Sequence, residues 1–247
     1  MKGIILAGGL GTRLYPLTKV TNKHLLPIYN KPMIYYPIKI LIEADVNEIM
    51  IVTGGNSAGD FMRLIGNGQE FGLKHVSYAY QEGEGGIAAA LSMAEHFAAK
   101  DQVIVVLGDN IIERSIKSFA DKFRRQKSGA KIILKKVPDP ERFGVPVFRG
   151  SKITRIEEKP KVPRSPFAVI GIYMYDNSVF EIIKTLKPSG RGELEITDVN
   201  NAYLKNAEMS YDILEGWWTD AGTFESLLKA NTLVAEKAKE KINIHAK

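Results

Sequence analysis

The sequence has no cysteine, only four histidines and no long apolar stretch. Without cysteine it can form no disulfide, no thiolate zinc site and no cysteine nucleophile, so any bound metal must use oxygen or imidazole ligands. No segment approaches the roughly 18 apolar residues that span a bilayer, and the N-terminal apolar run reaches glycines too soon for a signal peptide. These absences predict a cytoplasmic protein with no membrane segment.

The sequence has a modest excess of positively charged residues. Lysine and arginine number 34 against 28 aspartates and glutamates, a formal net charge of +6. Such an excess suits anionic substrates, a nucleic-acid backbone or an anionic membrane surface, and it does not choose between them. With 45% hydrophobic residues and a length of 247, the chain has an ordinary globular composition, and we expect a single domain over residues 1–247.

Short apolar runs alternate with segments of helical length in the first half of the chain. The predicted strands are Gly3 to Ala7, Glu48 to Thr53, His75 to Tyr80 and Val103 to Leu107, and the predicted helices between them include Met33 to Ala44 and Ile87 to Ala99. This order predicts an α/β fold with a Rossmann-like, mostly parallel sheet flanked by helices.

The second half has a different texture. After Ala130 the pattern becomes β-rich and predicts a mixed extension of the same sheet. An amphipathic helix is expected after Thr223, followed by a lysine-rich tail from Lys239 to Lys247. The candidate strands of this half are Lys131 to Val137, Val145 to Phe148, Lys152 to Glu157 and Val169 to Tyr175.

A glycine-rich segment follows the first predicted strand, at the edge of a parallel sheet where ligands bind. It reads Gly-Gly-Leu-Gly-Thr-Arg over residues 8–13. Glycines let backbone N–H groups approach phosphate oxygens, and Arg13 could add a charge-assisted clamp. The segment lacks the third glycine of the dinucleotide fingerprint and the Gly-Lys-Ser/Thr ending of a P-loop. A flexible strand-to-helix turn therefore remains the alternative.

Two aspartates are candidate metal ligands. Asp109 follows the continuous apolar run ending at Leu107, where a carboxylate could bind Mg²⁺ together with waters and phosphate oxygens. Asp220 is a second candidate. The alternatives are a Gly-Asp turn at Asp109 and a helix N-cap at Asp220.

Two lysines are candidate phosphate ligands. Lys23 could add a cation to a triphosphate site, and Lys159 could bind a sugar phosphate while Glu158 accepts sugar hydroxyls. For each lysine, a solvated side chain is the alternative.

Taken together, the motifs resemble the glucose-1-phosphate thymidylyltransferases, a branch of the sugar nucleotidyltransferase family. The resemblance runs from Lys2 to about Ala235 and includes Tyr35-Tyr36-Pro37. The matching blocks, in the family's order, are Gly-Gly-Leu-Gly-Thr-Arg-Leu-Tyr-Pro-Leu-Thr (8–18), Lys-His-Leu-Leu-Pro (23–27), Lys-Pro-Met-Ile-Tyr-Tyr-Pro (31–37), Leu-Gly-Asp-Asn (107–110), Glu-Glu-Lys-Pro (157–160), Arg-Gly-Glu-Leu-Glu-Ile-Thr-Asp-Val-Asn (191–200) and Trp-Thr-Asp-Ala-Gly-Thr (218–223).

The resemblance implies a nucleotide-diphospho-sugar transferase fold and an enzyme that makes dTDP-glucose and pyrophosphate from dTTP and glucose 1-phosphate with Mg²⁺, in a pathway toward dTDP-rhamnose. Residues 1–130 would form the nucleotide-binding part, and residues 131–247 the sugar-binding part. Catalysis would depend on Arg13, Lys23 and Lys159. By the same resemblance, Gly8, Gly11, Thr12, Arg13 and Asp109 would bind the nucleotide, Gln81 and Gly86 would read the base, Asp109 and Asp220 would hold the metal, and Gly144, Glu158, Lys159 and Val169 would bind the sugar phosphate.

Two departures from the family leave alternatives open. The loop over residues 81–88 lacks the proline and leucine that relatives often have, so UTP or another sugar phosphate remains an alternative. The sequence also ends soon after the helix that follows Asp220. We therefore expect a short form without a secondary nucleotide-sugar site, inhibited by dTDP-rhamnose weakly and only in competition with nucleotide.

Two other classes of protein fit the sequence less well. A nucleic-acid-binding module would use the net positive charge, but the basic residues over 122–127 lie late in a predicted helix and no aromatic-basic RNA motif is present. A non-catalytic regulatory homologue is disfavoured because Arg13 and both aspartates are present. None of the four histidines is needed as a base. We expect neither a nucleic-acid nor a membrane partner, and a homo-oligomer stays open.

Overall fold

The computed structural model of the protein describes residues 1–245. Within these residues one sheet has nine strands: β1 (Lys2–Ala7), β4 (Glu48–Gly54), β5 (His75–Gln81), β6 (Val103–Leu107), β8 (Ala130–Lys136), β9 (Gly144–Arg149), β10 (Lys152–Glu158), β11 (Phe167–Tyr175) and β12 (Met209–Ile213). Two short pairs, β2 (Pro27–Ile28) with β3 (Lys31–Pro32) and β7 (Asn110–Ile112) with β13 (Trp218–Asp220), lie beside it. The helices are α1 (Tyr35–Glu43), α2 (Ala58–Ile65), α3 (Ile87–Ser92), α4 (Glu95–Ala98), α5 (Lys117–Arg125), α6 (Val179–Thr185), α7 (Ile196–Lys205) and α8 (Phe224–His245).

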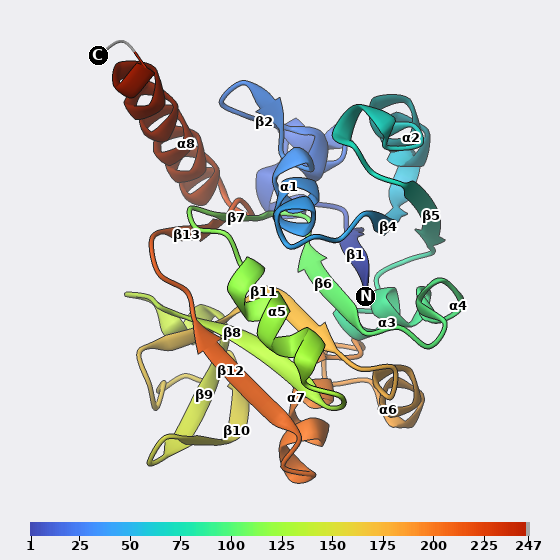
Figure 1. The fold of residues 1–247 in the computed structure, drawn as a ribbon, viewed down its shortest axis with the longest axis vertical. Coiled ribbons are helices and arrows are strands. Elements are labelled where there is room, and N and C mark those ends of the chain that lie inside the picture. The colour runs from blue at the N-terminus through green and yellow to red at the C-terminus, as the bar shows by residue number, and fades with distance from the viewer. Residues whose placement is uncertain (246–247) are drawn as a thin grey trace.

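The sheet combines a parallel centre with a mixed extension. β6, β1, β4 and β5 are neighbours in that order and all run parallel. β11 joins β6 in the antiparallel sense and connects the centre to β8, β9 and β10, while β12 pairs with β8 in parallel. The parallel strands come from the apolar runs of the first half, as a sheet buried on both faces requires. The predicted α/β class and the mixed extension are confirmed (Figure 1).

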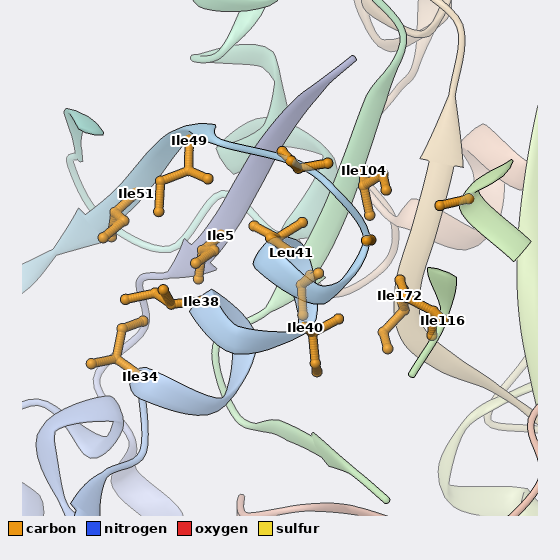
Figure 2. Packing of buried hydrophobic residues seen from close by; sticks show 14 of the residues in the cluster. Ile5, Ile34, Ile38, Ile40, Leu41, Ile49, Ile51, Ile104, Ile116 and Ile172 are labelled. Carbon is orange, nitrogen blue, oxygen red and sulfur yellow. The ribbon is translucent and has the colours of Figure 1, made fainter. Parts of the chain in front are cut away.

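Helices cover both faces of the sheet because its strands are apolar on both sides. In β1, Ile5 packs on the face that carries α1, and Ile4 packs on the opposite face with α3. Figure 2 shows the first of these layers, where Ile38 and Leu41 of α1 lie over the strands. Each fully buried aliphatic side chain of this kind stabilises the fold by about 1.5–3 kcal/mol relative to exposure.

Two predicted helix boundaries are wrong. The predicted helix Ile87 to Ala99 is two helices, because the Ala94 N–H bonds to the Leu91 carbonyl three residues back and the Ser92 hydroxyl bonds to the Ala89 carbonyl. These local bonds replace the α-helical pattern. The expected tail after Lys239 is helical through His245 as part of α8, and residues 246–247 lie outside the described part.

The last helix packs against the start of the chain. Ala230 of α8 is buried with Ile28 of β2 and Ile111 of β7 in a third apolar cluster. Ala221 of the same cluster follows β13, so this packing fixes the strand that carries Asp220. Across residues 1–245, no helix combines the length and the apolar content needed to cross a bilayer.

Candidate active site

The site is built where the parallel strands end. The segments after β1, β5 and β6 lie at one edge of the sheet, because parallel neighbours bring their carboxyl ends together. A Cβ placed on Gly8 would lie 3.0 Å from the Gln81 side-chain oxygen, and the Leu10 N–H donates to Glu84 Oε1 at 3.3 Å. The loop after β1 and the loop after β5 therefore form one surface.

The glycine-rich loop has the backbone that a phosphate cradle needs. Gly9 and Gly11 adopt positive φ angles of 88° and 63°, which side chains rarely tolerate. The Gly11 carbonyl accepts a hydrogen bond from the Thr18 hydroxyl at 2.7 Å, and the loop then enters a single 3-10 turn over Thr12–Leu14. The following segment thus holds the loop in shape and presents Arg13 at the cavity.

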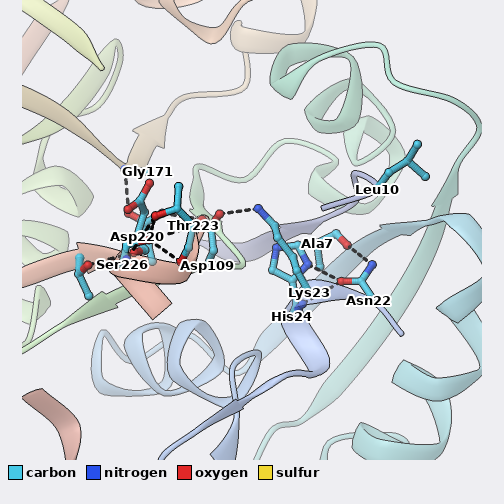
Figure 3. Close-up of polar contacts among 12 residues, drawn as sticks. Ala7, Leu10, Asn22, Lys23, His24, Asp109, Gly171, Asp220, Thr223 and Ser226 are labelled. Atoms are coloured by element: carbon cyan, nitrogen blue, oxygen red, sulfur yellow. Dashed lines mark hydrogen bonds and ion pairs between the residues drawn. The ribbon is translucent and has the colours of Figure 1, made fainter. Parts of the chain in front are cut away.

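Lys23 crosses from this segment to the end of β6. Its Nζ lies 2.5 Å from Asp109 Oδ2, and both side chains are mostly buried. The preceding Asn22 donates to the Ala7 carbonyl at 3.2 Å and accepts the His24 N–H at 2.9 Å (Figure 3). Asn22 therefore holds the turn that contains Lys23 against the end of β1, and this orients the Lys23 ammonium toward Asp109.

Asp109 is held as a carboxylate. Burial alone would raise its pKa, but the charge and hydrogen bond of Lys23 and the amide of Asn110 lower the pKa below the ordinary value. Asn110 donates to Asp109 Oδ1 at 3.0 Å and is itself fixed, because its Oδ1 accepts from the Gly171 N–H and the Trp218 indole N–H. The orientation of Asp109 therefore depends on three elements, β7, β11 and β13.

Asp220 faces Asp109 across a short strand pair. β13 runs antiparallel to β7 with Asp220 opposite Asn110, and the Ala221 N–H donates to the Asp109 carbonyl at 3.0 Å. Burial raises the pKa of Asp220, and the nearby Asp109 charge raises it further against the opposing effect of Arg142 and Arg13. Two acids thus share a mostly buried space in which one disfavours ionisation of the other.

This arrangement fits a divalent cation. A cation between Asp109 and Asp220 would relieve their repulsion, and Mg²⁺ takes one or two carboxylates and fills its other positions with water and phosphate oxygens. Among residues 1–245 no cluster of three or more acidic, histidine or cysteine side chains forms a metal site. The two carboxylates are therefore compatible with a metal shared with a phosphate substrate, and not with an all-protein cage.

A cavity of about 390 Å³ extends from these aspartates toward the mixed part of the sheet. Arg13, Asp109 and Asp220 line one part of it, and Gly144, Glu158, Lys159 and Val169 line another. The latter group comes together because Gly144 of β9 is paired with both Glu158 of β10 and Val169 of β11.

Glu158 and Lys159 differ in how they are held. Glu158 Oε2 accepts a hydrogen bond from the Thr197 hydroxyl at 2.6 Å, which orients the carboxylate. Lys159 has a positive φ of 44°, unusual for a residue with a side chain, and its N–H donates to the Phe143 carbonyl at 3.0 Å. Left-handed non-glycine residues cluster at binding sites, where the surrounding structure holds them.

The sequence profile of the nucleotidyl transferase family matches residues 2–237. The chain belongs to this family. A glucose-1-phosphate thymidylyltransferase of Neisseria meningitidis is 47% identical over 238 residues, which is 95% of this chain and 82% of that protein. The corresponding protein of Mycobacterium tuberculosis H37Rv is 43% identical, over 95% of this chain and 82% of its own.

Solved structures agree with the family. A Bacillus anthracis protein provisionally named glucose-1-phosphate thymidylyltransferase, solved with sucrose, superposes with a TM-score of 0.91 at 55% identity and covers 94% of each chain. A UDP-glucose pyrophosphorylase complexed with UDP-glucose has a TM-score of 0.85 at 26% identity and covers 96% of this chain and 98% of its own. The predicted nucleotide-diphospho-sugar transferase fold and an enzyme of nucleotidyl transfer are confirmed, and enzymes of this family generally use a divalent metal.

Within this nucleotidyl transferase, the predicted residues gather in two neighbouring places. Gly8, Gly11 and Thr12 follow β1, Gln81 is the last residue of β5, and Gly86 lies in the loop after β5. The other predicted residues line the cavity, except Lys23, which reaches its wall through Asp109. The roles of all these residues remain predictions.

Sequence reasoning missed several residues of the cavity wall, namely Asn110, Arg142, Tyr173, Asn200 and Trp218, together with Thr197. Asn110, Thr197, Asn200 and Trp218 lie in the blocks that carry the family resemblance, and those blocks were the signal for them. Arg142 and Tyr173 lie outside these blocks, in the mixed part of the sheet and the turn before β9, where strand ends do not all meet at one edge.

His24 gives a testable dependence of stability on pH. Burial, and after it the Lys23 ammonium, lowers the pKa of His24 from 6.5 to about 3. The unfolded chain therefore binds a proton on this ring below pH 6.5, whereas the folded chain binds it only below about pH 3. Its contribution to stability is present above pH 6.5 and is lost as the pH falls through that window.

When the pH is lowered from about 7.5 to about 5, we expect the unfolding free energy of the wild type to fall by about 2 kcal/mol more than that of the His24→Gln variant. Urea unfolding at the two pH values measures the difference. The same substitution at the exposed His96 is the control. Equal losses in the wild type and His24→Gln would show that His24 is not the buried neutral group.

Proposed function

We propose that this nucleotidyl transferase joins dTTP and glucose 1-phosphate to give dTDP-glucose and pyrophosphate. The observation that carries the proposal is the cavity in which two acids and several cations meet beside a glycine-rich phosphate loop. Relatives that are 42–47% identical to this chain are named for this reaction, and the matched region covers 77–82% of their length. In this proposal residues 1–130 bind the nucleotide, and residues 131–247 bind the sugar phosphate.

The base would be read by the loop after β5. Gln81 ends that strand and places its amide beside Gly8, so that it can offer both a donor and an acceptor to a pyrimidine edge. Gly86, with a φ of 88°, lies so close to the Leu194 carbonyl that a side chain there would collide. The glycine at this position is therefore required by the packing of residues 193–194 against the loop, and base reading by Gly86 is part of the proposal.

The chemistry follows from the charges. An oxygen of the glucose 1-phosphate anion attacks the α-phosphorus of dTTP, a new P–O bond forms, and the bond to the β-phosphate oxygen breaks to release pyrophosphate. The nucleophile is already an anion, so no base and no covalent intermediate is needed. The barrier comes from repulsion between anions and from charge that develops on pyrophosphate, and preorganised cations lower both.

The residues would divide this work by position. Arg13 and the loop amides would bind the triphosphate, and Lys23, fixed on Asp109, would keep positive charge beside the carboxylate. Lys159 would bind the sugar phosphate, and Glu158, oriented by Thr197, would accept sugar hydroxyls. Each of these groups is in place before substrate enters, as electrostatic catalysis requires.

Asp109 and Asp220 are the residues that would hold the metal, for which we propose Mg²⁺. When bound, the ion supplies positive charge to phosphate oxygens. The remaining steps of the proposal depend on the chain's own side chains: Asn110 orients Asp109, and Arg13 and Arg142 oppose the effect that raises the pKa of Asp220.

A panel of nucleoside triphosphates with glucose 1-phosphate, scored by pyrophosphate release, tests the proposal. We expect dTTP to be used best and UTP next, since one methyl group changes binding by only about 1–3 kcal/mol. We expect ATP and GTP to react far more slowly because they leave polar groups of the base pocket unpaired. Faster turnover with a purine would overturn the base assignment. The Gln81→Leu variant should lose most of the preference for dTTP over ATP, and Gln69→Leu, on the surface outside the site, should keep it.

A further inference from the structure

Arg142 is a cation on the cavity wall to which the proposed reaction gives no binding role. It lies at the end of a single 3-10 turn, Pro140–Arg142, two residues before Gly144 in β9. It lines the same cavity as Arg13, Lys159 and both aspartates. Its place in a short turn of the mixed sheet gives no sequence signal of such a role.

Contacts hold one edge of the guanidinium and leave the rest available. Arg142 Nη1 donates to Asp139 Oδ2 at 2.6 Å, and the guanidinium carbon lies 5.2 Å from the centre of the Phe143 ring. The other terminal nitrogen, Nη2, forms a long ion pair with Asp220 Oδ2 at 3.9 Å, beyond hydrogen-bond distance. The side chain is 41% exposed, so Asp139 and Phe143 fix an arginine whose second nitrogen can still take an acceptor.

Arg142 and Lys159 are neighbours in the structure although 17 positions apart in the sequence (159 minus 142). The Lys159 N–H donates to the carbonyl of Phe143, the residue after Arg142, at 3.0 Å. This bond ties the end of β10 to the turn before β9 and places both side chains on the cavity wall. Arg13 and Lys23 come instead from the segments after β1, so these four cations come as one pair from each of two parts of the chain.

The charge of the substrates favours a second cation beside Lys159. Glucose 1-phosphate carries a phosphate dianion into a site that also receives a triphosphate, and Lys159 Nζ already lies 3.8 Å from the Glu158 carboxylate. A guanidinium presents a planar pair of donors that matches two phosphate oxygens. We propose that Arg142 binds the phosphate of the incoming sugar 1-phosphate together with Lys159. The inference rests on the proposed function and adds a substrate-binding residue to it.

Steady-state kinetics of Arg142→Met test the inference. We expect the KM for glucose 1-phosphate to rise by about ten-fold or more, the usual effect of losing a charge-assisted hydrogen bond. The KM for dTTP, and the KM for pyrophosphate in the reverse reaction, should change by less than about two-fold, because those phosphates bind to the other pair of cations. Arg142→Lys, which keeps the charge without the fork, should fall between the wild type and Arg142→Met, and it supplies the test if Arg142→Met does not fold.

Two controls separate binding from structure. Asp139→Asn removes the carboxylate partner and keeps the guanidinium, so we expect a change in KM for glucose 1-phosphate of less than about three-fold. Arg149→Met removes an exposed arginine at the far end of β9 and should change nothing. The inference is wrong if Asp139→Asn matches Arg142→Met, if the KM for pyrophosphate rises in place of the KM for glucose 1-phosphate, or if Arg142→Met has wild-type kinetics.

The proposed function and the Arg142 inference fail in different ways. If the unmodified chain prefers another nucleoside triphosphate or sugar 1-phosphate, the proposed substrates are wrong, and the same variants are compared with the preferred pair. The rise in KM must then appear for that sugar 1-phosphate. Its absence overturns the role of Arg142 whatever the base.

Discussion

Replacing Asp109 by asparagine should lower kcat by roughly 10²-fold or more while the fold stays intact, because a lost metal ligand removes several kcal/mol of transition-state stabilisation. The side chain keeps its size, but Lys23 and Asn110 each donate to one carboxylate oxygen of Asp109, so only one of them can keep its hydrogen bond to the single oxygen of asparagine. The carboxylate charge is what disappears. Saturating substrate should not restore the rate, since the missing interaction is with charge that develops during the reaction.

The measurement is kcat at saturating dTTP, glucose 1-phosphate and Mg²⁺, with thermal unfolding to check the fold. Asp60→Asn changes a partly exposed aspartate on α2 whose partner is Arg63; it is the matched control and should keep full activity. The double variant Asp109→Asn with Asp220→Asn should be little worse than either single change, because groups that act as a unit are not additive. A kcat for Asp109→Asn within about three-fold of the wild type would contradict the metal assignment.

The central fold could be predicted because its signals are local. The apolar run Val103 to Leu107 needs no partner to be recognised as a buried strand, and β6 has those bounds. Ligands bind at the carboxyl ends of parallel strands, so the order of the elements along the chain is enough to place Gly8 and Asp109 at one edge of the sheet. Their closeness in space follows from the same topology.

The site's contacts could not be predicted, because they join residues that are far apart in sequence. Lys23 and Asp109 are 86 positions apart, and their ion pair requires both the β1–β6 pairing and the Asn22 turn. Thr197 reaches Glu158 only because α7 packs on β10. Arg142 lies in the turn before β9, next to the antiparallel part of the sheet, where no general rule says which strand end carries ligands.

The ends of the helices could not be predicted from the amino-acid composition either. Ile87 to Ala99 has helical length and many alanines, which favour a continuous helix. The break at Met93–Ala94 depends on the hydrogen bonds of the Ala94 N–H and the Ser92 hydroxyl, whose geometry no propensity scale contains. Such local competition between hydrogen bonds shifts boundaries without changing the fold.

The Arg13 guanidinium should contribute on the order of 3 kcal/mol to kcat/KM, which the Arg13→Ala variant measures. Arg13 lies in the turn after the glycine loop, and a Cβ on Gly222 would be 3.2 Å from its Nη2, so the guanidinium rests against the segment after Asp220. No hydrogen bond or ion pair within residues 1–245 holds this guanidinium, unlike Arg142 or Lys23. Its donors are therefore available for the triphosphate that we propose Arg13 binds.

A comparison of arginine with lysine at position 13 separates the effect of the charge from the effect of the donor geometry. If Arg13 binds phosphate through two parallel N–H groups, Arg13→Lys should recover only part of the loss. Lysine carries a compact charge and lacks the planar fork of N–H donors. Arg125→Ala, at the exposed end of α5, is the control for loss of a surface arginine. Equal kcat/KM for Arg13→Lys and the wild type would show that charge alone suffices. In that case the glycine loop, with the positive φ angles of Gly9 and Gly11, would have to set the orientation of the triphosphate through its backbone amides.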